Sequence, residues 1–428
     1  MDTYEITDTF PTPIVADFDT FLTGVENPDA YLTKAKLTLD RATLHALDAQ
    51  MKTFRTETHP HTDQEYYPLL NLFQRFCMAA RLHVAEPVKS QLRMIPTETV
   101  MAFRGLSPCE KYVALLEALW VDVDWNAIAP HTLSTILPEN DFLMESLMTL
   151  PVGKRINIRT SRQKNFYIGF DQNAALQVMS FLGLLTCEQS SDASVQRFLY
   201  RKGQIFFEAL TVSEFSHRVL KVLADQRPRG LWNMPARREF GGADFPGQAC
   251  EEGGGKGLAD SEPFHKALQP IFHVGALMRG LPRIESKTKK GTFVFKVHVG
   301  SGVWRTIAMS GKHTLDDLHL AIQKAVQFDD DHLFGFYMDG KPYSKNCYSD
   351  SRGDDGPFAE DAVIGQLDLW LHQHFLYLFD FGDEWRFEVE LAEVRDEPHK
   401  GKPKLLESKG KSPKQYRYED EDEEEDEE

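Results

Sequence analysis

Four alternating runs in the last third of the chain constrain its fold more than any other feature. Apolar residues alternate with more polar ones over residues 293–299, 303–309, 375–381 and 385–391. Because successive side chains of a strand point to opposite faces of a sheet, this period of two predicts strands with one buried face. Glycine-rich turns separate the two members of each pair, at 300–302 and at 382–383, so the runs predict two hairpins.

A helix is predicted between the two hairpins. Thr314 is a suitable N-cap, and the residues after it repeat an apolar stripe at helical spacing, formed by Leu315, Leu318, Ile322, Ala325 and Val326. A third strand is predicted at 333–338. Two strands, a helix and further strands are the element order of a β-grasp sheet wrapped on one helix, so we expect an α+β domain over residues 291–396.

Several short motifs in this region carry a resemblance to a known family. They are Trp304-Arg305, Thr314-Leu315, Leu318-His319, Asp330, His332-Leu333, Phe336 and the spaced string Tyr377, Phe379, Asp380, Phe381, Gly382, Asp383 and Trp385. This combination resembles the plasmid pRiA4b ORF-3-like family over residues 291–395. Segments at 32–34, 66–80 and 106–120 look like the N-terminal extension of its longer members. The resemblance implies a fold but no activity, and Phe387 stands where the family's pattern leads us to expect a histidine.

The polar residues of these motifs allow two interpretations. His319, His332, Asp380 and Asp383 combine imidazole and carboxylate donors, which suit a divalent metal such as zinc, manganese or iron. Alternatively, the two aspartates bond the backbone of their own turn, and His319, on the apolar stripe of its helix, is a satisfied core histidine. Because the sequence contains no Ser-His-Asp arrangement, activated cysteine or nucleotide fingerprint, it favours a binding role without a cofactor. A metal-dependent enzyme using this cluster is the alternative.

The first half of the chain predicts two units of helix, hairpin and helix. In the first, a helix within 66–83 and a hairpin at 82–94 precede a helix that Ser107 and Glu110 open as a capping box. In the second, a helix at 174–184 and strands at 185–187 and 204–207 precede a helix with a capping box at Thr211 and Glu214. This order resembles a winged helix.

Composition and charge divide the chain into five parts. A mainly helical, winged-helix-like domain is expected at 1–150 and a basic winged-helix-like domain at 151–240, which carries 14 Lys and Arg against 7 Asp and Glu in a chain of net charge −17. A glycine-rich linker and connecting segment is expected at 241–290. The α+β domain at 291–396 carries 9 Lys and Arg against 19 Asp and Glu. The remainder, 397–428, ends in ten consecutive acidic residues and is expected to be a disordered tail.

The basic domain suggests nucleic acid as a partner. Its cations flank the predicted helices and wing, where they would neutralise phosphates. The candidates are Arg159, Arg162, Lys164, Arg197, Arg201, Lys202, Arg218 and Lys221, with Arg227 and Arg229 following. A module used for packing or for contact with a protein partner, with its Lys and Arg as a solvated surface, is an equal alternative.

Other classes of protein are excluded by simpler features. No apolar run is long enough to span a bilayer, and the N-terminus lacks the pattern of a signal peptide, so we expect a cytoplasmic protein without a membrane partner. Five widely spaced cysteines, none in a Cys-x-x-Cys pair, read as reduced thiols.

Overall fold

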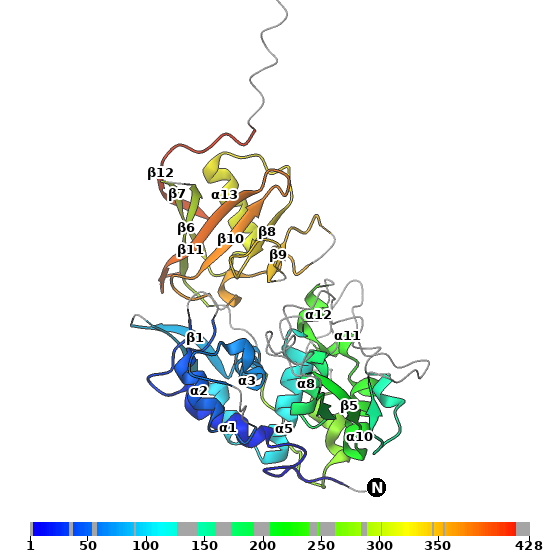
Figure 1. The fold of residues 1–428 in the computed structure, drawn as a ribbon. Coiled ribbons are helices and arrows are strands. Elements are labelled where there is room, and N and C mark those ends of the chain that lie inside the picture. The colour runs from blue at the N-terminus through cyan, green and yellow to red at the C-terminus, as the bar shows by residue number, and fades with distance from the viewer. Residues whose placement is uncertain are drawn as a thin grey trace, which may run out of the picture. The chain divides into compact units, whose positions relative to one another are not determined.

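The computed structural model forms two compact units (Figure 1). The first contains residues 1–238 and 242–284, and the second contains 239–241 and 285–428. The structure describes residues 3–33, 37–53, 58–89, 91–125, 144, 146–158, 173–191, 206–239, 246–247, 262–283, 289–300, 302–344, 346–353, 356–367 and 369–416. Residues 1–238, which make up nearly all of the predicted domains 1–150 and 151–240, therefore fall in one unit.

The first part of unit 1 is helical with one hairpin. Its elements are α1 (Ile14–Val25), α2 (Arg41–Asp48), η1 (Gln64–Tyr66), α3 (Pro68–Ala79), β1 (His83–Val88), β2 (Gln91–Pro96), α4 (Glu98–Arg104), α5 (Pro108–Glu117) and η2 (Ala118–Asp122). The predicted helix, hairpin and helix are all present. The Ser107 hydroxyl accepts from the Glu110 amide, and the Glu110 carboxylate accepts from the Ser107 amide, which confirms the capping box.

The second part of unit 1 repeats this order around a three-stranded sheet. Its elements are β3 (Ile156–Asn157), α8 (Asn173–Phe181), β4 (Thr186–Gln189), β5 (Phe207–Thr211), α10 (Glu214–Gln226), α11 (Arg229–Trp232), α12 (Met234–Glu239) and η5 (Phe264–Ile271). The sheet order is β3-β5-β4, and both pairings are antiparallel.

One sequence prediction in this part was wrong. Thr211 does not cap α10, because it is the last residue of β5 and pairs with Thr186; Ser213 caps the helix instead, by accepting from the Ser216 amide. The expected linker 241–290 also contains a packed segment. Its 3-10 helix η5 buries Phe264, Leu268 and Ile271, whose apolar side chains gain more from the core of unit 1 than from solvent.

Unit 2 is an antiparallel sheet of seven strands packed on one helix. The strands follow the order β12-β7-β6-β11-β10-β8-β9. Their bounds are β6 (Thr292–Gly300), β7 (Val303–Ser310), β8 (Phe334–Tyr337), β9 (Cys347–Ser349), β10 (His374–Phe379), β11 (Trp385–Arg395) and β12 (Lys404–Lys409), with α13 (Leu315–Val326) and η6 (Ile364–Gln366). Thr314 and Asp317 form the capping box that begins α13. This arrangement confirms the α+β class, with a helical N-terminal part and a large C-terminal sheet.

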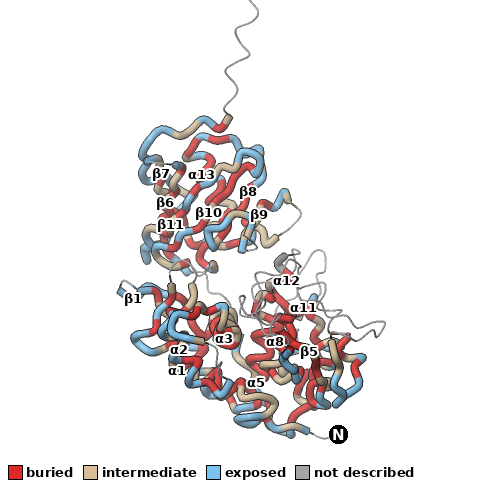
Figure 2. The backbone as a smooth tube through the Cα atoms, viewed as in Figure 1, coloured by how far each residue is buried: buried red, intermediate tan, exposed pale blue. Residues whose placement is uncertain are grey.

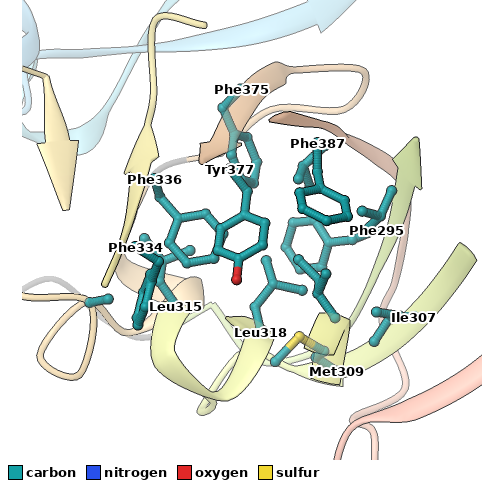
Figure 3. Close-up of a cluster of buried hydrophobic side chains, with 14 of the residues drawn as sticks. Phe295, Ile307, Met309, Leu315, Leu318, Phe334, Phe336, Phe375, Tyr377 and Phe387 are labelled. Carbon is teal, nitrogen blue, oxygen red and sulfur yellow. The ribbon is translucent and has the colours of Figure 1, made fainter. Parts of the chain in front are cut away.

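The core of unit 2 lies between the sheet and α13. Leu315 and Leu318 of the helix face a layer of aromatic side chains from the strands, among them Phe295, Phe336 and Tyr377 (Figure 3). Phe295 and Tyr377 occupy buried positions of the alternating runs, which is why the period of two predicted their strands correctly. Figure 2 shows the burial of the described residues, with buried segments inside each unit and exposed segments at its surface.

The predicted boundary between domain and tail, at residues 396 and 397, was wrong. Strand β12 pairs with β7, and the Arg305 guanidinium, buried on β7, donates to the Lys409 carbonyl and the Ser412 hydroxyl. Every residue of β12 is exposed, so the strand has no alternating pattern by which the sequence could reveal it. The domain therefore continues at least to residue 416, and the acidic run 419–428 lies outside the described residues.

In the part of the chain that the structure describes, no helix is long and apolar enough to cross a membrane.

Candidate functional site

A buried polar network links helix α13 to the sheet of unit 2. His319 is 1% exposed, and its Nδ1 lies 2.7 Å from the Tyr377 hydroxyl, while its Nε2 lies 3.0 Å from the Asp330 carboxylate. Gln323 donates to the same hydroxyl at 2.6 Å. In Figure 3 the hydroxyl oxygen of Tyr377 points toward the helix that carries these side chains.

The partners of His319 define its tautomer. A carboxylate only accepts, so Nε2 carries the proton and donates to Asp330, which leaves Nδ1 to accept from the Tyr377 hydroxyl. Burial lowers the pKa of His319 to about 4, although the Asp330 carboxylate opposes that shift. The imidazole is therefore neutral at physiological pH, and each of its nitrogens has one partner.

Arg352 extends the network to the loops at the end of the sheet. Its guanidinium contacts the Asp350 carboxylate at 2.6 Å and the Asp330 carboxylate at 3.0 Å, and it donates to the His332 carbonyl at 2.7 Å. Burial disfavours ionisation of Asp350, but the hydrogen bonds from Arg352 outweigh it and lower the pKa of that carboxyl. The arrangement joins the helix to the strand by neutral hydrogen bonds and to two loops by charge-assisted ones, which suits a rigid link between these elements.

The four predicted metal ligands do not come together. Both nitrogens of His319 are engaged in the network just described. His332 lies 3.5 Å from the Asp380 carboxylate, whose other oxygen accepts from the amides of Gly382 and Asp383. Among the residues that the structure describes, no group of three or more His, Cys, Asp or Glu side chains is placed to hold a metal ion. The Asp380 geometry is that of an aspartate bonding its own turn.

The remaining motif residues have packing contacts. Trp385 lies on the core, with its ring 4.9 Å from that of Phe328, and Trp304 is half-buried beneath the Lys296 ammonium. Arg305, besides holding the segment after β12, donates to the Ala325 carbonyl near the end of α13. These positions join elements of the domain to one another.

The candidate nucleic-acid residues divide into two groups. Arg159, Arg162, Lys164, Arg197, Arg201 and Lys202 lie outside the described residues. Arg218 and Lys221 lie on α10, where Arg218 donates to the Pro270 carbonyl and stacks on the Tyr4 ring, and Lys221 pairs with Asp225.

Two further cations near α10 are buried, contrary to the sequence interpretation. Arg227 stacks on the Trp232 ring at 4.6 Å and donates to the Pro263 carbonyl, and Arg229 lies over the Trp125 ring. Their guanidinium groups face aromatic rings of unit 1 because a planar, weakly hydrated cation packs well there. They are therefore not available to phosphates.

Sequence reasoning missed the residues that complete the polar network. Gln323, Asp350 and Arg352 do not themselves belong to any of the motifs found in the sequence. Arg352 joins the network through contacts with Asp330 and His332, which lie 22 and 20 residues away in the sequence. Gln323 had one local signal, since it lies four residues after His319 and so on the same helix face.

Comparison with known proteins gives one family match, and it lies in unit 2. Residues 294–416 match the family of the plasmid pRiA4b ORF-3-like protein, which confirms the resemblance found in the sequence. No curated protein matches the chain. Among solved structures, the crystal structure of a protein of unknown function, MM3350 from Methanosarcina mazei Go1, is 26% identical, with 29% of this chain and 73% of that chain covered and a TM-score of 0.25.

Proposed function

We propose that this chain is a binding or adaptor protein that contacts nucleic acid through its basic module, residues 151–240. The observation that carries the proposal is the charge of this module. It contains 14 Lys and Arg but only 7 Asp and Glu, within a chain of net charge −17. Clustered cations neutralise phosphates and release the counterions bound to them, which drives association with nucleic acid. The order of helix, two strands and helix around α8 and α10 supports this use.

The contacts of the described cations narrow the proposal to two segments. Arg155 pairs with Glu188 and Glu208, and Arg218 and Lys221 have the partners given above. The proposal therefore rests first on the cations of 159–164 and 197–202.

A salt titration of the full-length protein tests this proposal. The probes are a labelled DNA duplex and a labelled RNA hairpin, and affinity is measured by fluorescence anisotropy. The variant replaces the six cations of the two segments by glutamine: Arg159, Arg162, Lys164, Arg197, Arg201 and Lys202. If all six contact phosphates, log K of the unmodified protein falls with log salt at a slope of about −5, and the variant loses most of that slope.

The matched control removes the same charge from another part of the chain. It replaces six exposed lysines near the C-terminus by glutamine, which are Lys400, Lys402, Lys404, Lys409, Lys411 and Lys414. We expect the control to bind as the unmodified protein does. Equal loss of affinity in both variants would show a general charge effect, and unchanged affinity in the first would overturn the proposed interface.

A metal-dependent reaction in unit 2 is not favoured by any contact among the described residues. Metal analysis of the purified protein, beside a His332→Ala variant, checks this alternative.

A further inference from the structure

An exposed apolar surface surrounds the turn between β10 and β11. Phe381, in that turn, is 41% exposed, Tyr343 is 58% exposed and Leu333 is 39% exposed. The rings of Tyr343 and Phe381 lie 6.2 Å apart, and the Asp380 amide next to Phe381 donates to the Leu333 carbonyl. We call Leu333, Tyr343 and Phe381 the turn surface. Exposed apolar side chains that gather around one turn mark an interaction site more often than scattered ones do.

Specific contacts hold the turn surface in place. The Tyr343 hydroxyl donates to the Glu384 carboxylate at 2.5 Å, and the Tyr343 ring also lies against that of Tyr337, which is buried. Tyr343, Asp380 and Glu384 all have positive φ, at 61°, 57° and 50°. Residues other than glycine adopt this conformation only where their surroundings demand it. The two rings are thus presented on an ordered backbone.

Carboxylates flank the turn surface with few cations to balance them. Asp331 and Asp383 are exposed, and among the described residues neither has a Lys or Arg partner. Arg386 pairs with Glu384, and Arg352 is occupied by Asp330 and Asp350. Tyrosine hydroxyls donate hydrogen bonds to two of these carboxylates and favour their charged forms. The bond from Tyr416 lowers the pKa of Asp331, and the bond from Tyr343 lowers the pKa of Glu384.

We propose that the turn surface binds a cationic segment of a partner protein, in which Arg or Lys stands beside an apolar residue. The aliphatic stem of such a side chain packs on Leu333 and Phe381, its charged head lies over an aromatic ring, and Asp331 and Asp383 supply the counter-charge. The same carboxylates repel nucleic acid phosphates. They also oppose symmetric pairing of this surface with itself in a second copy of the chain.

Fluorescence anisotropy with two labelled peptides tests the inference on the full-length protein. One peptide repeats arginine, leucine and serine, and the other replaces each arginine by glutamate. We expect the unmodified protein to bind the arginine peptide and not the glutamate peptide. Failure to bind the arginine peptide, or equal binding of both, overturns the proposal.

Two variants place the binding on the turn surface. Phe381→Ser combined with Tyr343→Ser is expected to weaken binding of the arginine peptide on the order of tenfold, since both a cation–π contact and the apolar contact with the two rings are lost. Asp383→Asn is expected to weaken it about twofold to fivefold. The acidic run 419–428 attracts any cation in both proteins. The test therefore compares the dissociation constant of the arginine peptide for each variant with that for the unmodified protein.

Matched controls change exposed residues of unit 2 outside the turn surface. Leu320→Ser removes an apolar side chain on α13 that is 48% exposed, and Glu393→Gln removes a carboxylate that pairs with Arg395 on β11. We expect both controls to bind the arginine peptide as the unmodified protein does. Circular dichroism and thermal unfolding confirm that each variant is folded. Weakening by the controls equal to that of Phe381→Ser with Tyr343→Ser would remove the proposed site.

Discussion

The basic module and the end of the C-terminal sheet differ in whether their charged side chains are buried or exposed. Near α10, the arginines Arg227 and Arg229 turn inward onto tryptophan rings, although the sequence suggests a cationic surface. At the end of the sheet, Asp331 and Asp383 remain exposed beside apolar side chains, while Asp350 is buried against Arg352. A local excess of charge therefore predicts a partner only after the structure has shown which charged groups already have one.

Loss of Arg227 is the largest expected effect, and it tests whether the cations near α10 serve packing. Arg227→Ala removes the contacts with Trp232 and the Pro263 carbonyl, and we expect it to lower the free energy of unfolding by about 3 kcal/mol. Urea unfolding measures this change. Lys221→Ala is the control, expected to change stability by less than about 0.5 kcal/mol because its pair with Asp225 is exposed. If Arg227→Ala were as stable as the unmodified protein but bound DNA more weakly, Arg227 would serve nucleic acid binding and not packing.

The pH dependence of stability tests the buried network of unit 2. His319 has a folded pKa of about 4, below the value near 6.5 of the unfolded chain, so the unfolded state binds more protons between these values. The contribution of His319 is complete above pH ~6.5 and is lost as the pH falls to about 4, by up to about 3 kcal/mol. Unfolding at a series of pH values measures it, and His319→Gln should lack this part of the slope. An identical slope in both proteins would mean that His319 is not held neutral.

Removal of the Tyr377 hydroxyl tests how much one hydrogen-bonding group contributes to the stability of the same network. Tyr377→Phe leaves His319 Nδ1 without a donor and the Gln323 amide without an acceptor, so we expect a loss of about 2 kcal/mol in the free energy of unfolding. Tyr343→Phe is the matched control, since Tyr343 is exposed and its hydroxyl bonds Glu384 at the surface, and it should change stability by less than about 0.5 kcal/mol. An equal loss in the free energy of unfolding for both variants would show that the buried hydroxyl of Tyr377 contributes no more to stability than the exposed one of Tyr343.

The smallest expected effect concerns the acidic run 419–428. If this run competes with phosphates for the basic module, its deletion should tighten nucleic acid binding about twofold to fivefold at low salt. Anisotropy with the DNA duplex measures the change, and the effect should fade as salt rises. Unchanged affinity at low salt would show that the run does not mask the module.

Local patterns in the sequence predicted much of the fold. The alternating runs located β6, β7, β10 and β11, and the capping box at Ser107 and the N-cap at Thr314 located the starts of α5 and α13. These predictions succeeded because each pattern reflects a requirement of a few neighbouring residues, either a buried face or an unpaired amide at a helix end. Strand β12 escaped prediction because its pairing with β7 depends on backbone hydrogen bonds and not on a buried face.

The candidate site was predictable only in part. The sequence singled out His319 and Tyr377 through the motifs of the family, and it anticipated a satisfied core histidine as one of two interpretations. It did not indicate Arg352 or Gln323, and it suggested a convergence of His319 with His332 and Asp383 that the structure does not show. Contacts between distant segments depend on how the elements pack, and no local pattern records that packing.

The sequence by itself determined strands β6, β7, β8, β10 and β11 and helix α13 of unit 2, its α+β class and its resemblance to the pRiA4b ORF-3-like family, because these depend on the period and order of neighbouring residues. Only the tertiary structure decided which charges are available to a partner. Burial and pairing arise between segments far apart in the chain, so Arg227 became part of a core while Asp383 stayed in solvent.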